Sequence, residues 1–153
     1  MRKLWFMCLS VLAVLLMAGL MSCSSENNEN TEGEGPMLSR ADLKPVVGHW
    51  NLVGYSSEGV FVSVEGRLGK EMFIDLEDDG KMSGTICNEL SGSFSCNEKG
   101  DFSFSEYGGT KMMSDDEDIV FVEDHLAKVN KYESVDGVLR LFFAGKGYVE
   151  FRK

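Results

Sequence analysis

Basic residues and histidines are scarce in this chain. The 153 residues include 15 lysines and arginines against 25 aspartates and glutamates, which gives a formal net charge of −10. A protein that binds nucleic acid needs a basic patch that displaces counterions from the phosphates, and the sequence contains no such patch. The acidic surplus also opposes adsorption to anionic lipid headgroups. The composition therefore excludes nucleic acid as a partner.

Only two histidines, His49 and His125, are available to act as a general base for a cysteine. Nucleophilic catalysis needs a thiolate, a base within hydrogen-bond reach and a group that orients the base. No recognisable nucleophile motif accompanies either histidine, so we expect both to be surface or boundary residues. The sequence therefore predicts a protein that is not an enzyme and needs no cofactor.

Metal-binding patterns are also missing. Cys87 and Cys96 lie nine residues apart, whereas the ligand pairs of structural zinc sites lie about two to four residues apart. The segment "DLEDDG" (75–80) begins like a calcium-binding EF-hand loop, but Ile86 stands at the twelfth place, where a bidentate glutamate is required. We expect no metal site.

The N-terminus has the features of an export signal. Arg2 and Lys3 precede an uncharged apolar segment (4–21), and the motif "LMSC" (20–23) closes it. This order is typical of a signal peptide, and "LMSC" resembles the bacterial lipobox, in which the cysteine is acylated and becomes the mature N-terminus. We therefore expect residues 1–22 to be a lipoprotein signal peptide and Cys23 to carry the lipid. A membrane-spanning signal anchor is the alternative.

An acylated Cys23 predicts attachment to a membrane of the bacterial cell envelope. We expect the outer membrane, with the protein on its periplasmic face or at the cell surface. The following segment "SSENNENTEGEGP" (24–36) is polar and acidic and cannot build a core. It predicts a flexible tether over residues 23–45 and one globular domain over residues 46–153.

Short alternating or β-branched segments separated by glycine-rich turns predict strands along most of the domain. In "GHWNLVGY" (48–55), Trp50 and Leu52 alternate with polar neighbours, as in a half-buried strand. Asp-Gly pairs at 79–80 and 136–137 predict tight hairpin turns. Eight or nine strands are expected, within the segments 48–55, 59–66, 70–77, 81–87, 91–96, 100–107, 135–143 and 148–153.

One segment, "SDDEDIVFVEDHLAKVNKY" (114–132), has helical periodicity instead. Four of its apolar residues lie at steps of three, four and three: Ile119, Val122, Leu126 and Val129. This spacing predicts one helix near 115–129. Ser114 and Glu117 have the spacing of a capping box at its start.

Five segments, taken in order, resemble the META domain (HslJ-like) family: "GHWNL", "GTICNELSGSF", "GTKMMS", "EDHLAKVNKY" and "LRLFF". The resemblance implies an α+β fold, in which a curved antiparallel β-sheet of about eight short strands packs on a single helix. It implies no enzyme activity and no cofactor, because the family is mostly described as envelope or secreted proteins linked to stress tolerance. The residues that match its motifs are Trp50, Cys87, Asn88, Gly92, Thr110 and Met112.

The two cysteines of the domain suggest a disulfide. If Ser91-Gly92 formed a two-residue hairpin turn, Cys87 and Cys96 would face each other in a non-hydrogen-bonded pair, close enough to be bridged. A four-residue loop would instead place Cys87 opposite Phe94, and two buried thiols are the alternative. Family members often carry a cysteine where this chain has Ser114, so the resemblance leaves only Cys96 as a partner for Cys87.

Three functions are compatible with the sequence. The first is a non-catalytic, lipid-anchored domain that binds a protein or an envelope component. The second is a small-ligand carrier, because Gly-x-Trp on a first strand also begins lipocalin-like barrels, which hold one ligand inside. Its cavity would be lined by Phe61, Phe73, Phe102 and Phe142. The third is a thiol enzyme or redox switch that uses Cys87.

Overall fold

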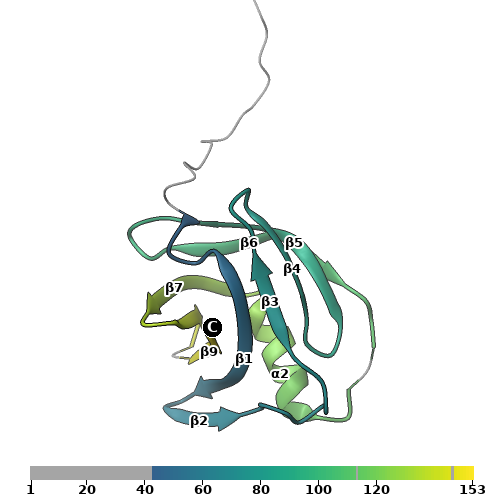
Figure 1. Cartoon of the computed structure of the whole chain (residues 1–153). Coiled ribbons are helices and arrows are strands. Elements are labelled where there is room, and N and C mark those ends of the chain that lie inside the picture. The colour runs from purple at the N-terminus through teal and green to yellow at the C-terminus, as the bar shows by residue number, and fades with distance from the viewer. Residues whose placement is uncertain (1–42, 113, 146) are drawn as a thin grey trace, which may run out of the picture. The chain divides into compact units, whose positions relative to one another are not determined.

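Residues 43–112, 114–145 and 147–153 are described by the computed structural model. The predicted signal peptide and Cys23 lie outside these ranges. The strands are β1 (Gly48–Ser57), β2 (Val60–Ser63), β3 (Phe73–Leu76), β4 (Lys81–Thr85), β5 (Glu89–Cys96), β6 (Phe102–Gly109), β7 (Val129–Val135), β8 (Val138–Phe143) and β9 (Gly147–Arg152). Helix α2 (Glu117–Leu126) lies between β6 and β7 (Figure 1).

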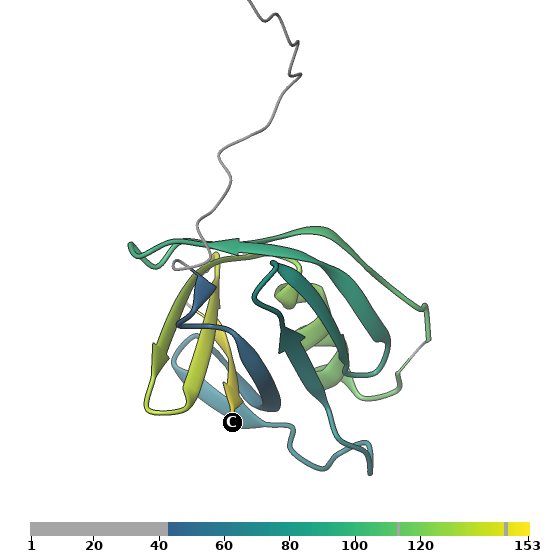
Figure 2. The same ribbon diagram turned by 45° about the horizontal axis from the view of Figure 1, so that its top comes forward.

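The nine strands form one antiparallel sheet in the order β6-β5-β4-β3-β1-β9-β8-β7, and β2 pairs with β1 outside this path. The sheet curls so far that its two outer strands approach each other (Figure 2). Asp101, just before β6, forms an isolated bridge with Lys131 of β7, and the Tyr132 amide donates to the Gly100 carbonyl at 2.8 Å. The predicted curved antiparallel sheet with one helix is confirmed.

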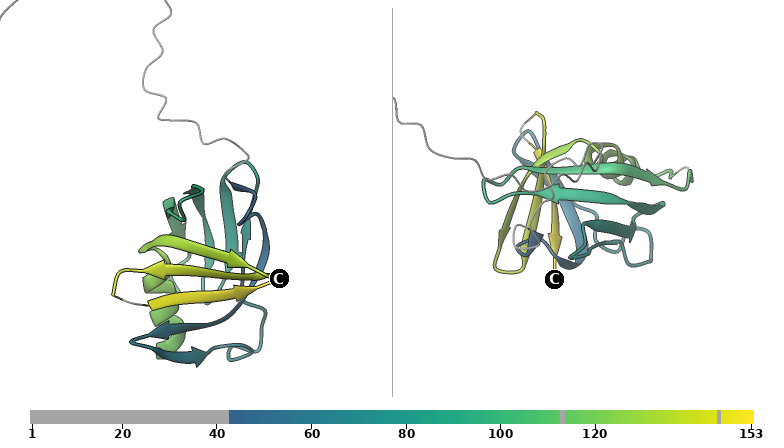
Figure 3. Two further views of the ribbon diagram at one scale, coloured as in Figure 1. Left: turned by 90° about the vertical axis from the view of Figure 1, so that its left-hand side faces the viewer. Right: turned by 90° about the horizontal axis from the view of Figure 1, so that it is seen from above.

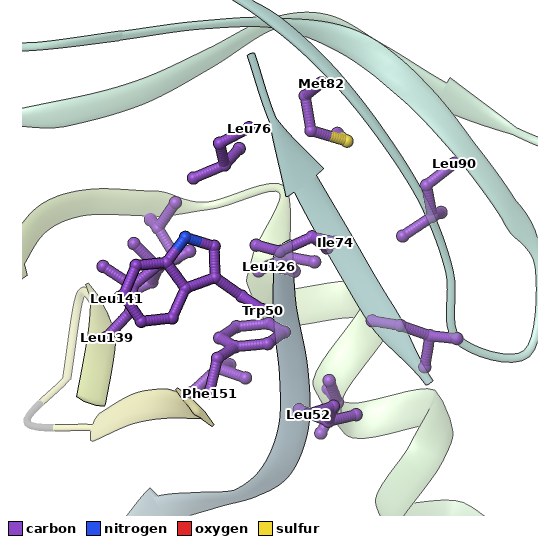
Figure 4. Packing of buried hydrophobic residues seen from close by; sticks show 14 of the residues in the cluster. Trp50, Leu52, Ile74, Leu76, Met82, Leu90, Leu126, Leu139, Leu141 and Phe151 are labelled. Atoms are coloured by element: carbon purple, nitrogen blue, oxygen red, sulfur yellow. The ribbon is translucent and has the colours of Figure 1, made fainter. Parts of the chain in front are cut away.

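The sheet is strongly curved (Figure 3), and the buried side chains form one core. Alternation decides which side chains enter it: in β8, Leu139 and Leu141 are fully buried, whereas Arg140 between them is only half-buried. Helix α2 contributes Ile119, Val122 and Leu126, which were predicted to share one face and are all buried. Figure 4 shows Trp50, Leu52, Ile74, Leu76, Met82, Leu90, Leu126, Leu139, Leu141 and Phe151 packed together.

Both predicted Asp-Gly turns are confirmed. At the β7–β8 hairpin, Asp136 and Gly137 have φ values of 50° and 77°, the pair of positive angles that a type I′ turn requires. At the β3–β4 hairpin, the Gly80 amide donates to the Glu77 carbonyl at 3.0 Å, and the Glu77 amide donates to the Lys81 carbonyl at 2.9 Å.

The predicted hairpin at Ser91-Gly92 is wrong. Both residues lie inside β5, which pairs with β4 in a register that places Gly92 opposite Met82. A Cβ atom on Gly92 would lie 3.0 Å from the Ser105 carbonyl oxygen and 3.1 Å from the Tyr107 Cα. Glycine is therefore needed there because β6 approaches closely, at a shift in the β5–β6 register, and not because the chain turns.

This register also rules out the predicted disulfide. Cys87 precedes β5 and Cys96 ends it, and the eight residues of this strand extend over about 23 Å at roughly 3.3 Å per step. A disulfide needs Cα atoms about 4.4–6.8 Å apart. The two cysteines are buried and are not joined to each other, which agrees with the alternative of two buried thiols.

The predicted helix boundaries need correction at both ends. The N-cap is Asp116, whose carboxylate accepts from the amides of Asp118 (3.0 Å) and Ile119 (3.3 Å), so Ser114 and Glu117 do not form a capping box. The Ser114 hydroxyl accepts from the Asp116 amide at 3.1 Å instead. At the other end, Val129 is buried as predicted but is the first residue of β7.

The folded part begins before residue 46. Leu43, which was predicted to lie in the tether, is 4% exposed and belongs to the core. Its carbonyl accepts from the Val46 amide at 3.0 Å. No helix among the described residues is long and apolar enough to cross a membrane.

Candidate functional site

Asn88 and Glu123 form the centre of a polar cluster that joins the β4–β5 turn to helix α2. Oε1 of Glu123 accepts from the backbone amides of Cys87 (2.9 Å) and Asn88 (2.8 Å), and Oε2 accepts from the Asn88 side-chain amide at 2.6 Å. Hydrogen bonds to a carboxylate are stronger than those between neutral groups. One carboxylate of the helix therefore fixes the whole turn.

Thr110 and Met112 complete the cluster from the segment after β6. The Asn88 Oδ1 accepts from the Met112 amide at 2.6 Å and from the Thr110 hydroxyl at 3.3 Å. The Thr110 Oγ1 in turn accepts from the Glu89 amide at 3.1 Å. Four of the predicted motif residues, Cys87, Asn88, Thr110 and Met112, therefore meet in one network whose bonds are structural.

The other two motif residues lie elsewhere. Trp50 is 1% exposed in the core, and its Nε1 donates to the Val46 carbonyl at 2.7 Å. Gly92 lies at the β5–β6 register shift described above. The motif residues therefore stabilise the fold at three separate places: the polar cluster, the core and the register shift between β5 and β6.

The two histidines have contacts that do not involve Cys87. Nδ1 of His49 lies 2.7 Å from Asp75 Oδ1 on the outer face of β1 and β3, and this hydrogen bond raises the pKa of His49. Nδ1 of His125 lies 2.9 Å from the Phe121 carbonyl oxygen, and its ring stacks on that of Phe121. The structure thus brings neither histidine to the Cys87 thiol, which is 8% exposed.

The four phenylalanines expected to line a carrier cavity do not share one. Phe102 is buried in the core, whereas Phe61 is 44% exposed on β2. Phe73 packs against the outward-facing His49, and Phe142 packs against Tyr148. The arrangement predicted for a lipocalin-like interior is therefore contradicted.

The loop between β2 and β3 (64–72) is tied to the start of helix α2. Arg67 forms ion pairs with Asp118 and, at 3.5 Å, with Asp116. The Tyr55 hydroxyl donates to Asp118 Oδ1 at 2.6 Å. Burial, followed by this hydrogen bond, raises the pKa of Tyr55 to about 12. The bond from Tyr55 and the ion pair with Arg67 hold the pKa of Asp118 below its usual value.

The raised pKa of Tyr55 predicts a loss of stability at alkaline pH. The folded state binds this proton more tightly than the unfolded state, so its contribution is complete below pH 10 and is lost as the pH rises towards 12. We expect Tyr55→Phe to reduce the slope of unfolding free energy against pH in this window, measured by urea denaturation. Burial also raises the pKa of Tyr107, so part of the slope remains.

Asp118→Asn is the matched variant for this measurement. Burial is the larger cause of the Tyr55 shift, so most of the slope should survive in Asp118→Asn. An alkaline slope that is the same in Tyr55→Phe and in the unchanged protein would contradict the assignment.

Two pockets lie on either side of the 64–72 loop, and Lys70 lines both. The first, of about 460 Å³, lies between the loop, β1 and the end of β9. The second, of about 450 Å³, lies between the loop and the segment before α2 and includes Cys87 and Met112. Nζ of Lys70 donates to the Cys87 carbonyl at 3.1 Å. The motif cluster and the first pocket are therefore joined through one lysine.

A comparison with protein-family models matches the META domain over residues 41–153. The chain belongs to the META domain family. The match covers the whole described part of the chain, so the resemblance inferred from five short segments is confirmed. A comparison with curated proteins gives no match.

Solved structures share the fold of this META domain. A DUF4847 family protein from Bacteroides vulgatus ATCC 8482 is 18% identical, with a TM-score of 0.53 over 69% of this chain and 91% of that chain. A protein from Burkholderia xenovorans, solved by NMR, is 17% identical, with a TM-score of 0.55 over 83% of this chain and 97% of that chain. At these identities the likeness shows the fold alone.

Sequence reasoning missed three residues of this META domain that position its surface. Glu123 lies inside the matching segment "EDHLAKVNKY", but its partners come from a turn 35 residues earlier. Lys70 and Arg67 lie in a loop without periodicity, and their contacts depend on where α2 lies. The only sequence signal for this loop is its concentration of charged residues between two strands.

Proposed function

We propose that this protein is a lipid-anchored protein of the bacterial cell envelope whose META domain binds a protein or another envelope component and catalyses no reaction. The lipid on Cys23 would hold it at a membrane, most simply the outer membrane. The association of the family with stress tolerance supports a role under envelope stress. The binding function would be carried by the outer surface of the domain.

The packed interior is the observation that supports a surface binding role. Trp50, Leu139, Leu141 and Phe151 fill the concave side of the sheet and are at most 1% exposed. A ligand therefore has to bind outside the core. In the two pockets beside the 64–72 loop, charged and apolar side chains line the same hollow.

The anchor and the partner are tested together in cells. A photo-crosslinking amino acid replaces Glu65, which lines the first pocket, and the cells are fed radiolabelled fatty acid. We expect the protein to be labelled, to sediment with membranes and to form a discrete adduct on illumination. Cys23→Ala should lose the label, the sedimentation and the adduct, because the domain would no longer be held near its partner.

Cys8→Ala is the matched control, because Cys8 lies in the predicted signal peptide and is removed with it. This variant should keep both the label and the adduct. Equal labelling of Cys23→Ala and the unchanged protein would refute the anchor. Labelling without any adduct would refute the envelope partner.

A further inference from the structure

The first pocket beside the 64–72 loop is formed by three segments that are distant in the sequence. Residues 51–53 of β1 form its floor, residues 65–66 and 70–72 of the loop form one wall, and Arg152 and Lys153 form the other. Asn51 and Arg152 are direct neighbours in the β1–β9 register. With a volume of about 460 Å³, the pocket lies in the range of small-ligand sites.

Three cations line this pocket although the chain is strongly acidic. Other contacts hold each of them in place. Lys70 donates to the Cys87 carbonyl at 3.1 Å, Arg152 donates to Glu150 at 3.0 Å, and the Lys153 ammonium lies 4.8 Å from the centre of the Trp50 ring. Cations fixed in advance lose little side-chain entropy when an anion binds. The pocket is therefore prepared for a negatively charged group.

Asn51 adds an unsatisfied acceptor to the floor. Its Oδ1 is shielded from solvent and has no hydrogen-bond partner among the described residues. Buried polar atoms are nearly always paired, so this oxygen would accept from a water molecule or, after rotation of the Asn51 amide towards the pocket, from a ligand N–H. A ligand that combines an anionic group with a nearby N–H would satisfy both the cations and Asn51.

We propose that this pocket binds the C-terminal end of a peptide. The terminal carboxylate would lie among Lys70, Arg152 and Lys153, and the adjacent amide N–H would donate to Asn51 Oδ1. Glu65 and Glu71 also line the pocket and repel ligands of higher negative charge, which favours one carboxylate over a phosphate. The inference deepens the proposed binding role and rests on it, because it names the ligand class of one surface pocket.

The experiment is an NMR titration of the full chain, ¹⁵N-labelled and purified in detergent. The probe is acetyl-Ala-Ala, which has a free carboxylate and an adjacent amide N–H, and acetyl-Ala-Ala-amide is the uncharged comparison. We expect acetyl-Ala-Ala to shift the Asn51 side-chain amide and the backbone amides of Gly66, Lys70 and Arg152. The amidated peptide should leave these resonances in place.

Lys70→Gln removes the charge but keeps an N–H donor, on a side chain one bond shorter; unchanged far-ultraviolet circular dichroism would show that the fold is preserved. It should weaken the affinity for acetyl-Ala-Ala about tenfold, the usual effect of losing one charge-assisted hydrogen bond. Lys81→Gln is the matched control, because Lys81 is exposed at the start of β4 and pairs with Asp79. It should leave the affinity unchanged.

Four outcomes would overturn the inference. They are equal binding of the amidated peptide, tighter binding of inorganic phosphate than of acetyl-Ala-Ala, an equal effect of the two lysine variants, and shifts that map away from Asn51. The absence of a shift with either peptide, as expected if a water molecule satisfies Asn51, would overturn the inference as well. None of these results would affect fatty-acid labelling at Cys23. If the proposed envelope function were wrong instead, the label or the adduct would be lost but the peptide-induced shifts would remain.

Discussion

Trp50→Ala is expected to lower the free energy of unfolding by about 4 kcal/mol, the usual cost of truncating a buried aromatic side chain. The indole is 1% exposed, lies beside Phe151 in the core (Figure 4), and donates to the Val46 carbonyl. Alanine would leave a cavity where β1, β9 and α2 meet, and the carbonyl would lose its donor. Urea denaturation followed by far-ultraviolet circular dichroism measures the change.

Two further variants keep this prediction testable if Trp50→Ala fails to fold. Trp50→Phe retains most of the ring volume but not the N–H, so it should cost less than Trp50→Ala and remain measurable. Val60→Ala removes an apolar side chain that is 64% exposed, and the change should stay within about 0.5 kcal/mol. Truncations in a protein core usually cost more than this, so a decrease of less than about 1 kcal/mol in the unfolding free energy of Trp50→Ala would contradict the prediction. It would show that Trp50 does not organise the core.

Glu123→Ala should have the second-largest effect, a loss of about 3 kcal/mol. The change leaves the amides of Cys87 and Asn88 and the Asn88 side chain without their shared acceptor. Each unsatisfied buried donor costs about 1–3 kcal/mol, and water can partly replace the acceptor because Glu123 is only half-buried. Hydrogen exchange at the Cys87 and Asn88 amides would measure the local effect directly.

Asp124→Ala is the matched control for this change. Asp124 is the next residue of α2 and is exposed, so its loss should alter stability by less than about 0.5 kcal/mol. Glu123→Gln keeps one acceptor oxygen and should lie between the two variants. Unchanged exchange of the Cys87 and Asn88 amides in Glu123→Ala would contradict the assignment.

Most strands were predictable because each places apolar residues on one face of the sheet. Leu139 and Leu141 alternate with Arg140 in β8, and the Asp-Gly turns follow from local backbone geometry. These features depend on neighbouring residues alone. The sequence therefore determines the strand pattern and the class of the fold.

The errors occurred where a distant segment decides the local structure. Ser91-Gly92 has the composition of a turn, yet Gly92 is required because β6 passes 3.0 Å from where its Cβ would lie. The start of α2 offers several acceptors in a row, and the N-cap is Asp116, next to the ion pairs formed by Arg67. Neither outcome can be derived from the segment itself.

The candidate site was only partly predictable for the same reason. The family resemblance identified Asn88, Thr110 and Met112, which lie together as one network. The partner of Asn88, Glu123, comes from the helix, and the first pocket combines β1, a loop and β9. Such combinations depend on how the sheet curls, which residue spacing does not encode.

The pairing of β1 with β9 has a consequence for how the chain acquires its structure. In the sequence, β1 is the first strand of the sheet and β9 is the last. In the sheet, however, they are neighbours near its middle, with Leu52 opposite Phe151. A growing chain therefore cannot complete the centre of the sheet until β9 has been synthesised. Contacts between such distant segments slow folding. The centre of the sheet therefore stays unpaired in a nascent chain until β9 can reach β1.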